Sequence, residues 1–524
     1  MPAPDPLSPR CERRRDDLPC GGVAVPGHDV CLAHLDPADR SMYLRTLGKA
    51  DATLDLRDTE VDGPLLDEIL KRCGGQLPRS LHLENTRFVG PVSFRGATFT
   101  GEAIFRSATF SGAVTFDDCV FTETAAFDTC EFAAMATFRD ARFGKDAYFD
   151  RTEFGSATFS RARFAGAARF SGVRFREPCW FDEAQFDATA AFDAVQFDGS
   201  VVFRAKFTGP ARLGVRAHEL RMSGSHFERS ADLRVEAVTF FCNSTRFDGS
   251  VTLRVRYAAV TAENVVFGAP SSISRFDGLV LTDSDRTLIP SWIMDIVVKR
   301  TELRASETDV MLLSLQGTDV SNLMLSDVYL GACRFAGTHR LEALRIEGFC
   351  QFAQPPKWRA RRQILAEEAR WRDWESELET REGVQPERIS AMYRSLRKSF
   401  EDSKNEAGAG DFYYGEMEMR RRAPSTRRAE RLILWFYWLL SGYGQRAGRA
   451  LLALLVLIST VAGLLVVWGQ PVEVAARIAV GAVVFRDDRT DLTATGEWTV
   501  LVARFLGPVL LALAVLAVRA RVKR

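Results

Sequence analysis

The stretch "ATFTGEAIFRSATFSGAVTF", residues 97–116, places phenylalanine at positions 99, 105, 110 and 116 and alanine at 97, 103 and 108, each two positions before a phenylalanine. An amphipathic helix repeats its apolar residues every three or four positions and a half-buried strand every second position, so neither gives this spacing. Phenylalanine continues at alternating steps of five and six residues almost throughout positions 94–207. Four steps span 22 residues from Phe94 to Phe116 and again to Phe138, so one structural repeat is about 22 residues long.

The 22-residue period indicates a solenoid, in which coils stack because a single coil cannot bury its own apolar face. If each step forms one side of a four-sided coil, phenylalanine points inward from every side, and the small residue two positions earlier shares that direction. Equivalent rings in neighbouring coils are then one strand separation apart, about 4.8 Å, and stack on each other. One predicted column contains Phe94, Phe116, Phe138, Phe159, Phe181 and Phe203.

The segments "GATF" at 96–99 and "SATF" at 107–110 and 156–159 resemble the pentapeptide-repeat family, whose unit centres on Phe or Leu with Ala two positions before it. The resemblance implies a mainly β fold, a right-handed quadrilateral β-helix. It is close over residues 88–207 and looser, through "GSHFERSADL" and "STRFDGSVTL", to about residue 337. We interpret the five- and six-residue steps as alternating sides of the coil, and we predict that residues 88–350 form the β-helix.

The open end of a β-helix exposes unpaired backbone and apolar rings, so a solenoid needs a cap. Before the first coil, "LDLRDTEVDGPLLDEIL" and "LPRSLHLENTRF" have the patterns of a strand, a helix and a strand. We therefore predict that residues 41–87 form an N-terminal cap.

Residues 1–40 contain Cys11, Cys20, Cys31 and His34. Only two residues separate Cys31 from His34, and Cys20 precedes two glycines where the chain can wrap an ion. Zinc prefers four such ligands in a tetrahedron, and a small segment without its own core gains its fold from the metal. The segment resembles the short Cys3His knuckles of bacterial proteins, which implies one zinc ion per chain. Unligated thiols are the alternative, and His28 is a spare candidate ligand.

Residues 351–430 change to charged helical patterns. We predict one helix in "KWRARRQILAEEARWRDWESELE", a second from Pro386 that "GAG" at 408–410 ends, and a third in "DFYYGEMEMRRR". We interpret this segment as a linker or bundle that couples the solenoid to the C-terminal apolar segments or mediates homo-oligomerisation.

Two apolar runs lie near the C-terminus. The first, Ala450–Trp468, has 19 uncharged residues, and at about 1.5 Å per residue it matches the roughly 30 Å hydrocarbon layer of a bilayer. The second, Trp498–Val518, is interrupted only by Arg504 and by Gly507-Pro508. We predict two transmembrane helices within residues 450–524, and Arg504 either snorkels to the headgroups or faces a partner helix or a watery path.

Basic residues cluster before the first run and after the second, whereas the connection between them is acidic. The positive-inside rule therefore predicts both termini and the β-helix in the cytoplasm, with two spans of the plasma membrane. Tryptophan, tyrosine and arginine in residues 431–449 favour an interfacial helix in contact with membrane lipids. The spread of the cysteines and the polar first forty residues also favour a reducing cytosol.

The C-terminal half, including "SGYG" and "LGPVLLALAVLAVRARVKR", resembles bacterial membrane-associated pentapeptide-repeat proteins. Many of these end in two helices related to the pore module of potassium channels. The stretch Val472–Phe485, at the position of the filter loop, shares only Val480-Gly481 with a "TVGYG" filter, so potassium selectivity is not supported. It is too short to span a bilayer and can form a short helix that enters one leaflet.

No grouping of serine, histidine and carboxylate suggests a nucleophile, and no glycine-rich phosphate loop is present, so we do not expect an enzyme. We predict a membrane-anchored scaffold whose β-helix binds an unknown cytosolic protein. The alternative is an oligomeric ion channel or stress-responsive pore that the solenoid gates. A DNA mimic that binds topoisomerase is less favoured, because residues 88–207 carry 16 acidic and 13 basic side chains. The net charge of +1 also predicts no nucleic-acid partner.

Overall fold

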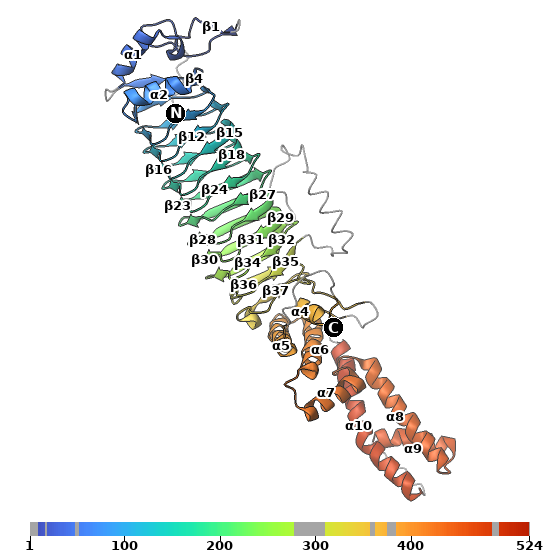
Figure 1. Ribbon diagram of the computed structural model, residues 1–524. Coiled ribbons are helices and arrows are strands. Elements are labelled where there is room, and N and C mark those ends of the chain that lie inside the picture. The colour runs from blue at the N-terminus through green and yellow to red at the C-terminus, as the bar shows by residue number, and fades with distance from the viewer. Residues whose placement is uncertain are drawn as a thin grey trace. The chain divides into compact units, whose positions relative to one another are not determined.

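A computed structural model describes residues 9–15, 18–47, 52–276, 310–356, 362–374, 384–484 and 492–522. The chain divides into two compact units. The first contains the residues up to 333 together with 337–339 and 347–350, and the second contains 334–336, 340–346 and the residues from 351 onward. Figure 1 shows stacked strands in the first unit and helices in the second.

Each full coil of the first unit has four sides, and in the first coils each side is one short strand. In one coil these are β9 (Thr98–Phe99), β10 (Ala103–Ile104), β11 (Thr109–Phe110) and β12 (Val114–Thr115). The next coil starts with β13 (Val120–Phe121), which pairs in parallel with β9 and places Phe121 beside Phe99. The predicted mainly β solenoid is therefore confirmed.

One side of the solenoid is a ten-stranded sheet. Its strands are β5 (Gln76–Leu77), β9, β13, β16 (Arg142–Phe143), β19 (Arg163–Phe164), β23 (Gln185–Phe186), β26 (Lys206–Phe207), β28 (His226–Phe227), β30 (Arg246–Phe247) and β33 (Val266–Phe267). The remaining solenoid strands are β3 (Thr53–Asp55), β4 (Glu60–Asp62), β6 (Ser80–His82), β7 (Arg87–Val89), β8 (Val92–Ser93), β10, β11, β12, β14 (Ala125–Ala126), β15 (Glu131–Thr137), β17 (Ala147–Tyr148), β18 (Glu153–Thr158), β20 (Ala168–Arg169), β21 (Arg174–Phe175), β22 (Cys179–Trp180), β24 (Ala190–Phe197), β25 (Val201–Val202), β27 (Ala211–Arg221), β29 (Ala231–Phe241), β31 (Val251–Arg256), β32 (Ala259–Thr261), β34 (Ser271–Arg275), β35 (Met311–Ser314), β36 (Leu323–Ser326) and β37 (Arg345–Glu347).

Columns of stacked phenylalanine rings fill the solenoid core. In the column that begins at Phe94, successive ring centroids are 4.9, 4.9, 4.8, 5.0 and 4.5 Å apart up to Phe203. The opposite side supplies Phe105, whose ring meets Phe116 edge-on at 5.5 Å and 86°. Rings thus stack between coils and meet edge-to-face across a coil, the two arrangements that aromatic quadrupoles prefer.

The alternation of five- and six-residue steps follows from two kinds of corner. Five-residue steps contain a tight turn whose second residue has positive φ, as at Ser107, Asp118, Thr129 and Asp140, eleven residues apart, whereas the step from Phe154 to Phe159 runs along β18 without one. The six-residue steps turn without such a residue in the same coils. Each coil therefore has two tight and two wider corners, and the six-residue steps are regular parts of the fold.

Coils after Phe207 are shorter, which explains why the sequence pattern loosens there. Phe207, Phe227, Phe247 and Phe267 follow at 20-residue intervals and still stack, with centroids 4.5, 5.0 and 5.7 Å apart. Along the other three sides, β27 and β29 in successive coils are continuous 11-residue strands, and each replaces the three short strands of an earlier coil. Buried leucine and valine replace phenylalanine along these strands, so the apolar core continues with other side chains.

At the N-terminal end of the solenoid, helix α2 (Gly63–Arg72) follows strand β4, and α1 (Pro37–Thr46) precedes the first coil (Figure 1). Asp62 caps α2 by accepting a hydrogen bond from the Leu65 backbone N–H at 2.9 Å. Leu65, Leu66 and Ile69 on one face of α2 are buried. This helix covers apolar surface at the end of the coil stack, as the capping argument requires.

The second unit contains the helices that follow the solenoid. They are α4 (Ala366–Trp371), α5 (Pro386–Asp402), α6 (Glu406–Arg422), α7 (Arg428–Ser441), α8 (Ala447–Val467), α9 (Val472–Val483) and α10 (Ala494–Val522), with a 3-10 turn at Leu341–Ala343. The predicted first helix is described only at 362–374 and is helical only in α4, because 357–361 and 375–383 lie outside the described residues.

The prediction that "GAG" at 408–410 ends a helix is wrong, because these residues lie inside α6. The break occurs at residues 403–405, where Lys404 has positive φ and Asn405 caps α6 by accepting a hydrogen bond from the Gly408 N–H at 2.9 Å. A Cβ atom at Gly408 would lie 2.9 Å from the Phe400 ring, so this glycine permits close packing of α5 on α6.

Helix α9 lies between α8 and α10 (Figure 1) and packs on both through one apolar cluster. The cluster includes Leu465 of α8, Ala475 and Ala479 of α9, and Val500 of α10. The 12-residue helix agrees with the short helix expected at Val472–Phe485, whose last residue lies outside the described residues. Val480 and Gly481 are helical and do not form an extended filter strand.

Candidate metal centre

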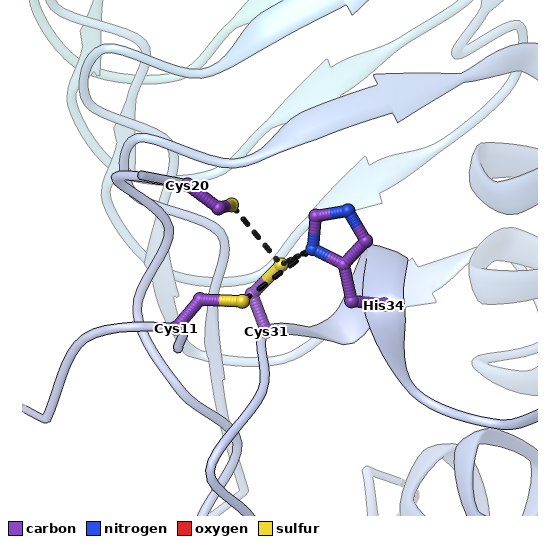
Figure 2. Close-up of side chains that lie close together, drawn as sticks. All are labelled: Cys11, Cys20, Cys31 and His34. Atoms are coloured by element: carbon purple, nitrogen blue, oxygen red, sulfur yellow. Dashed lines mark hydrogen bonds between the residues drawn. The ribbon is translucent and has the colours of Figure 1, made fainter. Parts of the chain in front are cut away.

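The four predicted ligands come from separate short segments near the N-terminus. Cys11 precedes β1 (Arg14–Arg15), and Cys20 follows β2 (Leu18–Pro19), which pairs with β1 in an antiparallel hairpin. Cys31 precedes a 3-10 turn, Leu32–His34, of which His34 is the last residue, and the His34 N–H donates to the Cys31 carbonyl at 3.0 Å. The hairpin and the turn bring all four side chains together (Figure 2).

The distances between the side chains agree with a tetrahedral metal site. All four potential ligand atoms lie within 4.8 Å of one another. The Sγ atoms of Cys20 and Cys31 are 3.8 Å apart, and His34 Nδ1 is 3.4 Å from the Sγ atoms of both Cys11 and Cys31. Typical zinc bond lengths in a tetrahedron give about 3.8 Å between sulfur ligands and about 3.5 Å between sulfur and nitrogen. The Cys3His cluster can therefore hold a metal ion.

Burial and hydrogen bonds set the pKa values of the three thiols in opposite directions. It raises the pKa of Cys31 to about 12, with a further contribution from neighbouring Cys20, and it also raises the pKa of Cys20. For Cys11, backbone hydrogen bonds outweigh the effect of burial, and the pKa is lowered. Three thiolates this close repel one another, and a bound divalent cation would supply the charge that compensates them.

The cluster is attached to the first coil of the solenoid. The Val23 N–H donates to the Arg57 carbonyl at 3.2 Å, and Arg10 forms an ion pair with Asp58. A Cβ atom at Gly22 would lie 2.8 Å from the Thr59 hydroxyl and 3.0 Å from the Cys31 Cβ. Glycine at position 22 thus allows the ligand segment to lie directly against the turn at residues 56–59. No sequence pattern had pointed to Thr59 or to this contact.

The other predicted site residues lie apart from the cluster. His28, the spare ligand, is not among the four converging side chains. Cys119, Cys130 and Cys179 occupy inward positions two residues before phenylalanines and are fully buried, as packing residues would be. Arg504 is half-buried on α10. The six phenylalanines of the predicted column are all buried in the solenoid.

Two helices of the second unit are long and apolar enough to cross a membrane, judged by length and composition. They are Ala447–Val467, with a mean hydropathy of 2.9, and Ala494–Arg519, with a mean hydropathy of 2.4. Most residues of both are exposed, with 17% and 33% buried, unlike the core helices of a globular domain. Leu452, Leu455 and Phe505 are among the exposed apolar side chains.

Stacked parallel coils with an aromatic core define the first unit as a β-solenoid. Residues 76–120, 105–153 and 149–196 match the family model described as pentapeptide repeats (9 copies). The chain thus contains pentapeptide repeats, which lie in the solenoid, and its two apolar C-terminal helices agree with the predicted membrane-associated type. Comparison with curated proteins and comparison with solved structures gave no match.

Proposed function

We propose that the protein is a non-enzymatic, membrane-anchored scaffold that presents its β-helix to a cytosolic protein. The observation that carries this proposal is the combination, in one chain, of a rigid repeat surface and two apolar helices that expose large side chains. Pentapeptide-repeat proteins generally have structural or interaction roles, which supports the same interpretation. The basic flanks of the helices favour both termini in the cytoplasm.

The charges on the solenoid surface favour protein binding over imitation of DNA. Opposite charges one coil apart form ion pairs, such as Arg161 with Asp140 at 2.6 Å and Lys206 with Glu228 at 2.9 Å. Arg174 and Asp198 pair in the same way at 2.9 Å. DNA carries an unbroken series of negative charges, which this alternating surface does not reproduce.

Site-specific cross-linking in intact membranes tests the scaffold. A photo-reactive residue in place of exposed Arg142, on the outer face of β16, is expected to capture a distinct protein. The matched control places the same group at Phe143, which is buried, and should capture nothing. The captured protein should also leave the membrane fraction when this chain is deleted. Equal capture at both positions, or membrane association that does not depend on this chain, would contradict the scaffold.

An oligomeric pore is the second proposal, and the packing of α9 between α8 and α10 supports it. A short helix wedged between two longer helices is the arrangement expected if several copies line a pore. Purified protein in a planar bilayer distinguishes the two proposals: ion conductance above that of protein-free bilayers supports the pore, and its absence leaves the anchor role alone.

We also propose that the Cys3His cluster binds one zinc ion. The agreement of its sulfur and nitrogen distances with zinc bond lengths supports this identity. Bound zinc would hold the N-terminal segment against residues 56–59 and so stabilise the end of the solenoid.

A further inference from the structure

Six arginine side chains line a cavity of about 470 Å³ in the helical unit. They are Arg362, Arg372, Arg421, Arg422, Arg446 and Arg449. Aromatic side chains from α6 and α7, including Tyr414, Trp435 and Trp438, form other parts of its wall. The cavity is therefore both strongly basic and partly apolar.

Carboxylates balance only some of this positive charge. Glu368 forms ion pairs with Arg362 and with Arg372, the latter at 2.7 Å. Glu418 pairs with Arg372, Arg421 and Arg422 at 3.0 to 3.2 Å. Six guanidinium groups thus share these two carboxylates and that of Asp411, which also accepts a hydrogen bond from the Gln363 N–H. The excess favours an anionic ligand.

The unbalanced positive charge lies on Arg446 and Arg449. Neither side chain forms an ion pair with a carboxylate in the described part of the chain. Burial lowers the pKa of Arg446, and Arg449 and Arg362 lower it further. Like charges held this close are destabilising unless an anion neutralises them. These two arginines are therefore the groups most in need of a ligand.

Aromatic rings hold the guanidinium planes in position. Arg446 lies over the Tyr414 ring at 5.2 Å, and Arg449 and Arg421 lie over the Trp438 ring at 5.1 and 4.8 Å. The Trp438 Nε1–H donates to the Tyr414 hydroxyl at 3.0 Å and so links the two rings. Arg449 donates one hydrogen bond to the Trp438 carbonyl at 3.4 Å. Stacking leaves the other N–H donors at the edges of the guanidinium groups, and paired N–H donors match the oxygens of phosphate.

The cavity lies where the first long apolar helix begins. Arg446 is the N-cap of α8 and Arg449 lies in its first turn, and the exposed Leu451 and Leu452 follow after the buried Ala450. Exposed Ile433 and Phe436 of α7 provide further apolar surface. If α8 spans the bilayer, as the proposed function requires, these arginines lie at the depth of the headgroup phosphates.

We propose that this cavity binds the phosphate of an anionic phospholipid headgroup, and this inference rests on the membrane anchorage proposed above. The shared chemistry is a phosphate oxyanion held by Arg446 and Arg449. A lipid is the favoured source because the adjoining surfaces of α7 and α8 are apolar. The site would give the protein a preference for anionic membranes that a hydrophobic anchor alone does not provide.

The test measures lipid binding by the full chain in detergent, with phosphatidylglycerol and phosphatidylcholine titrated separately. The pocket variant is R446Q/R449Q, which leaves no carboxylate without its ion-pair partner. The matched control is R427Q/R428Q, which removes the same charge from exposed positions outside the cavity. We expect phosphatidylglycerol to bind at least about tenfold more weakly to the pocket variant, and the control to change less than about twofold.

Three further measurements test the proposal. R446K/R449K keeps the charge but loses the paired donors, and we expect an intermediate affinity. Inorganic phosphate is titrated as the soluble source, and binding as tight as that of phosphatidylglycerol would overturn the lipid assignment. Equal loss of lipid binding in pocket and control variants would overturn the site. Insertion of all variants into vesicles, measured by carbonate extraction, tests the anchor separately, so failure of the anchor is distinguishable from failure of the site.

Discussion

At the scale of single residues, Phe138 shows how strongly the solenoid core depends on each ring. It is completely buried and stacks between Phe116 at 4.9 Å and Phe159 at 4.8 Å. Phe127 and Phe149 meet it edge-to-face at 5.6 and 5.7 Å. One side chain therefore contributes to the contacts of three successive coils.

Replacing Phe138 by alanine should destabilise the protein by about 3 to 5 kcal/mol, because it leaves a cavity in the column and removes ring contacts on all sides. Phe138→Leu is the matched control and should cost less than about 1.5 kcal/mol, since later coils use leucine at inward positions. Urea unfolding followed by circular dichroism measures both. Equal midpoints for the alanine variant and the parent would show that the column contributes little.

For the metal centre, protein purified without chelator should contain about one zinc ion per chain, and C31S should contain none. C73S is the matched control, because Cys73 lies outside the cluster and should not affect metal content. Metal analysis by mass spectrometry reads out both. A metal-free parent protein would exclude zinc.

The sequence predicted the inward phenylalanines and the possible metal ligands, but not the positive-φ corners or the contact of Gly22. The spacing of phenylalanine predicted inward rings, because burial acts directly on side-chain type. The positive-φ corners could not be predicted, since serine, aspartate, threonine and arginine all occupy them and glycine does so at few coils. Residue types identified the four possible metal ligands. The contact of Gly22 with Thr59 could not be predicted, because the two residues are 37 positions apart and no local sequence pattern indicates a contact at that separation.

At the scale of elements, close approach between α5 and α6 depends on glycine. A Cβ atom at Gly415 would lie only 2.6 Å from the Tyr393 ring. Tyr393 is itself fully buried and donates a hydrogen bond to Glu368 at 2.6 Å. The ring has little freedom to move, and α5 would have to separate from α6.

Gly415→Ala should therefore destabilise the helical unit by about 1 to 3 kcal/mol, although alanine is the better helix former by about 1 kcal/mol. Gly448→Ala is the matched control, because a Cβ atom there meets no neighbour within 4 Å and should leave stability unchanged or raise it. Thermal unfolding in detergent compares them. If the Gly415→Ala variant were more stable than the parent, helix propensity would outweigh packing.

The ion-pair cluster around Glu418 gives the helical unit a dependence on pH. Burial opposes ionisation of Glu418, but Arg421, Arg422 and Arg372 outweigh it and lower its pKa to about 2. Because the folded pKa lies below the ordinary value of 4.5, the stabilisation is fully present above about pH 4.5 and is lost as the pH falls toward 2. The stabilisation that is lost amounts to roughly 3 kcal/mol.

Glu418→Gln should thus lower the melting temperature at pH 7 and reduce its fall between pH 4.5 and 3. Glu430→Gln is the control, because Glu430 forms a more exposed ion pair with Arg420 at 2.6 Å. Thermal melting at several pH values provides the measurement. Parallel pH profiles for the parent and the E418Q variant would assign the acid sensitivity to other groups.

Element boundaries were predictable where a residue acts locally. Pro386 marked the start of α5, because proline is tolerated at the first position of a helix. The glycines at 408–410 led to a wrong prediction of a helix end. Gly408 allows close packing against Phe400, and helix propensity does not reveal such a tertiary contact. The Arg446–Arg449 cavity was also missed, although clustered arginine and tryptophan at residues 431–449 had indicated an interfacial segment.

At the scale of the whole molecule, the two apolar helices and their flanking charges determine the topology that we propose. Helix α10 begins at residues 494–497, next to the acidic segment that connects the two apolar helices. Helix α7 begins at residues 427–428, in the basic segment that precedes the first apolar helix. If both helices span the membrane, the positive-inside rule predicts these two points on opposite faces. Length and composition were enough to predict two helices that are long and apolar enough to cross a membrane, because the bilayer constrains both properties strongly.

Cysteine labelling of intact cells measures this topology. A cysteine at exposed Ala494 should react with a membrane-impermeant thiol reagent, whereas a cysteine at exposed Arg427 should react only after permeabilisation. Both positions lie outside the Cys3His cluster. The reverse pattern would invert the hairpin, and labelling of both sites before permeabilisation would contradict a two-span anchor with a cytoplasmic N-terminus.

The in-register stacking of the coils also bears on how such a chain changes length over evolution. Residues 117–138 form one complete 22-residue period, and Phe116 and Phe138 occupy equivalent places in adjacent coils. Excision of this period would join Phe116 to Arg139 without shifting any later ring to another side. Each duplication or loss of a period changes the exposed length by one strand separation, about 4.8 Å. Duplication or deletion of whole periods can thus lengthen or shorten this surface in equal increments, while its cross-section stays constant.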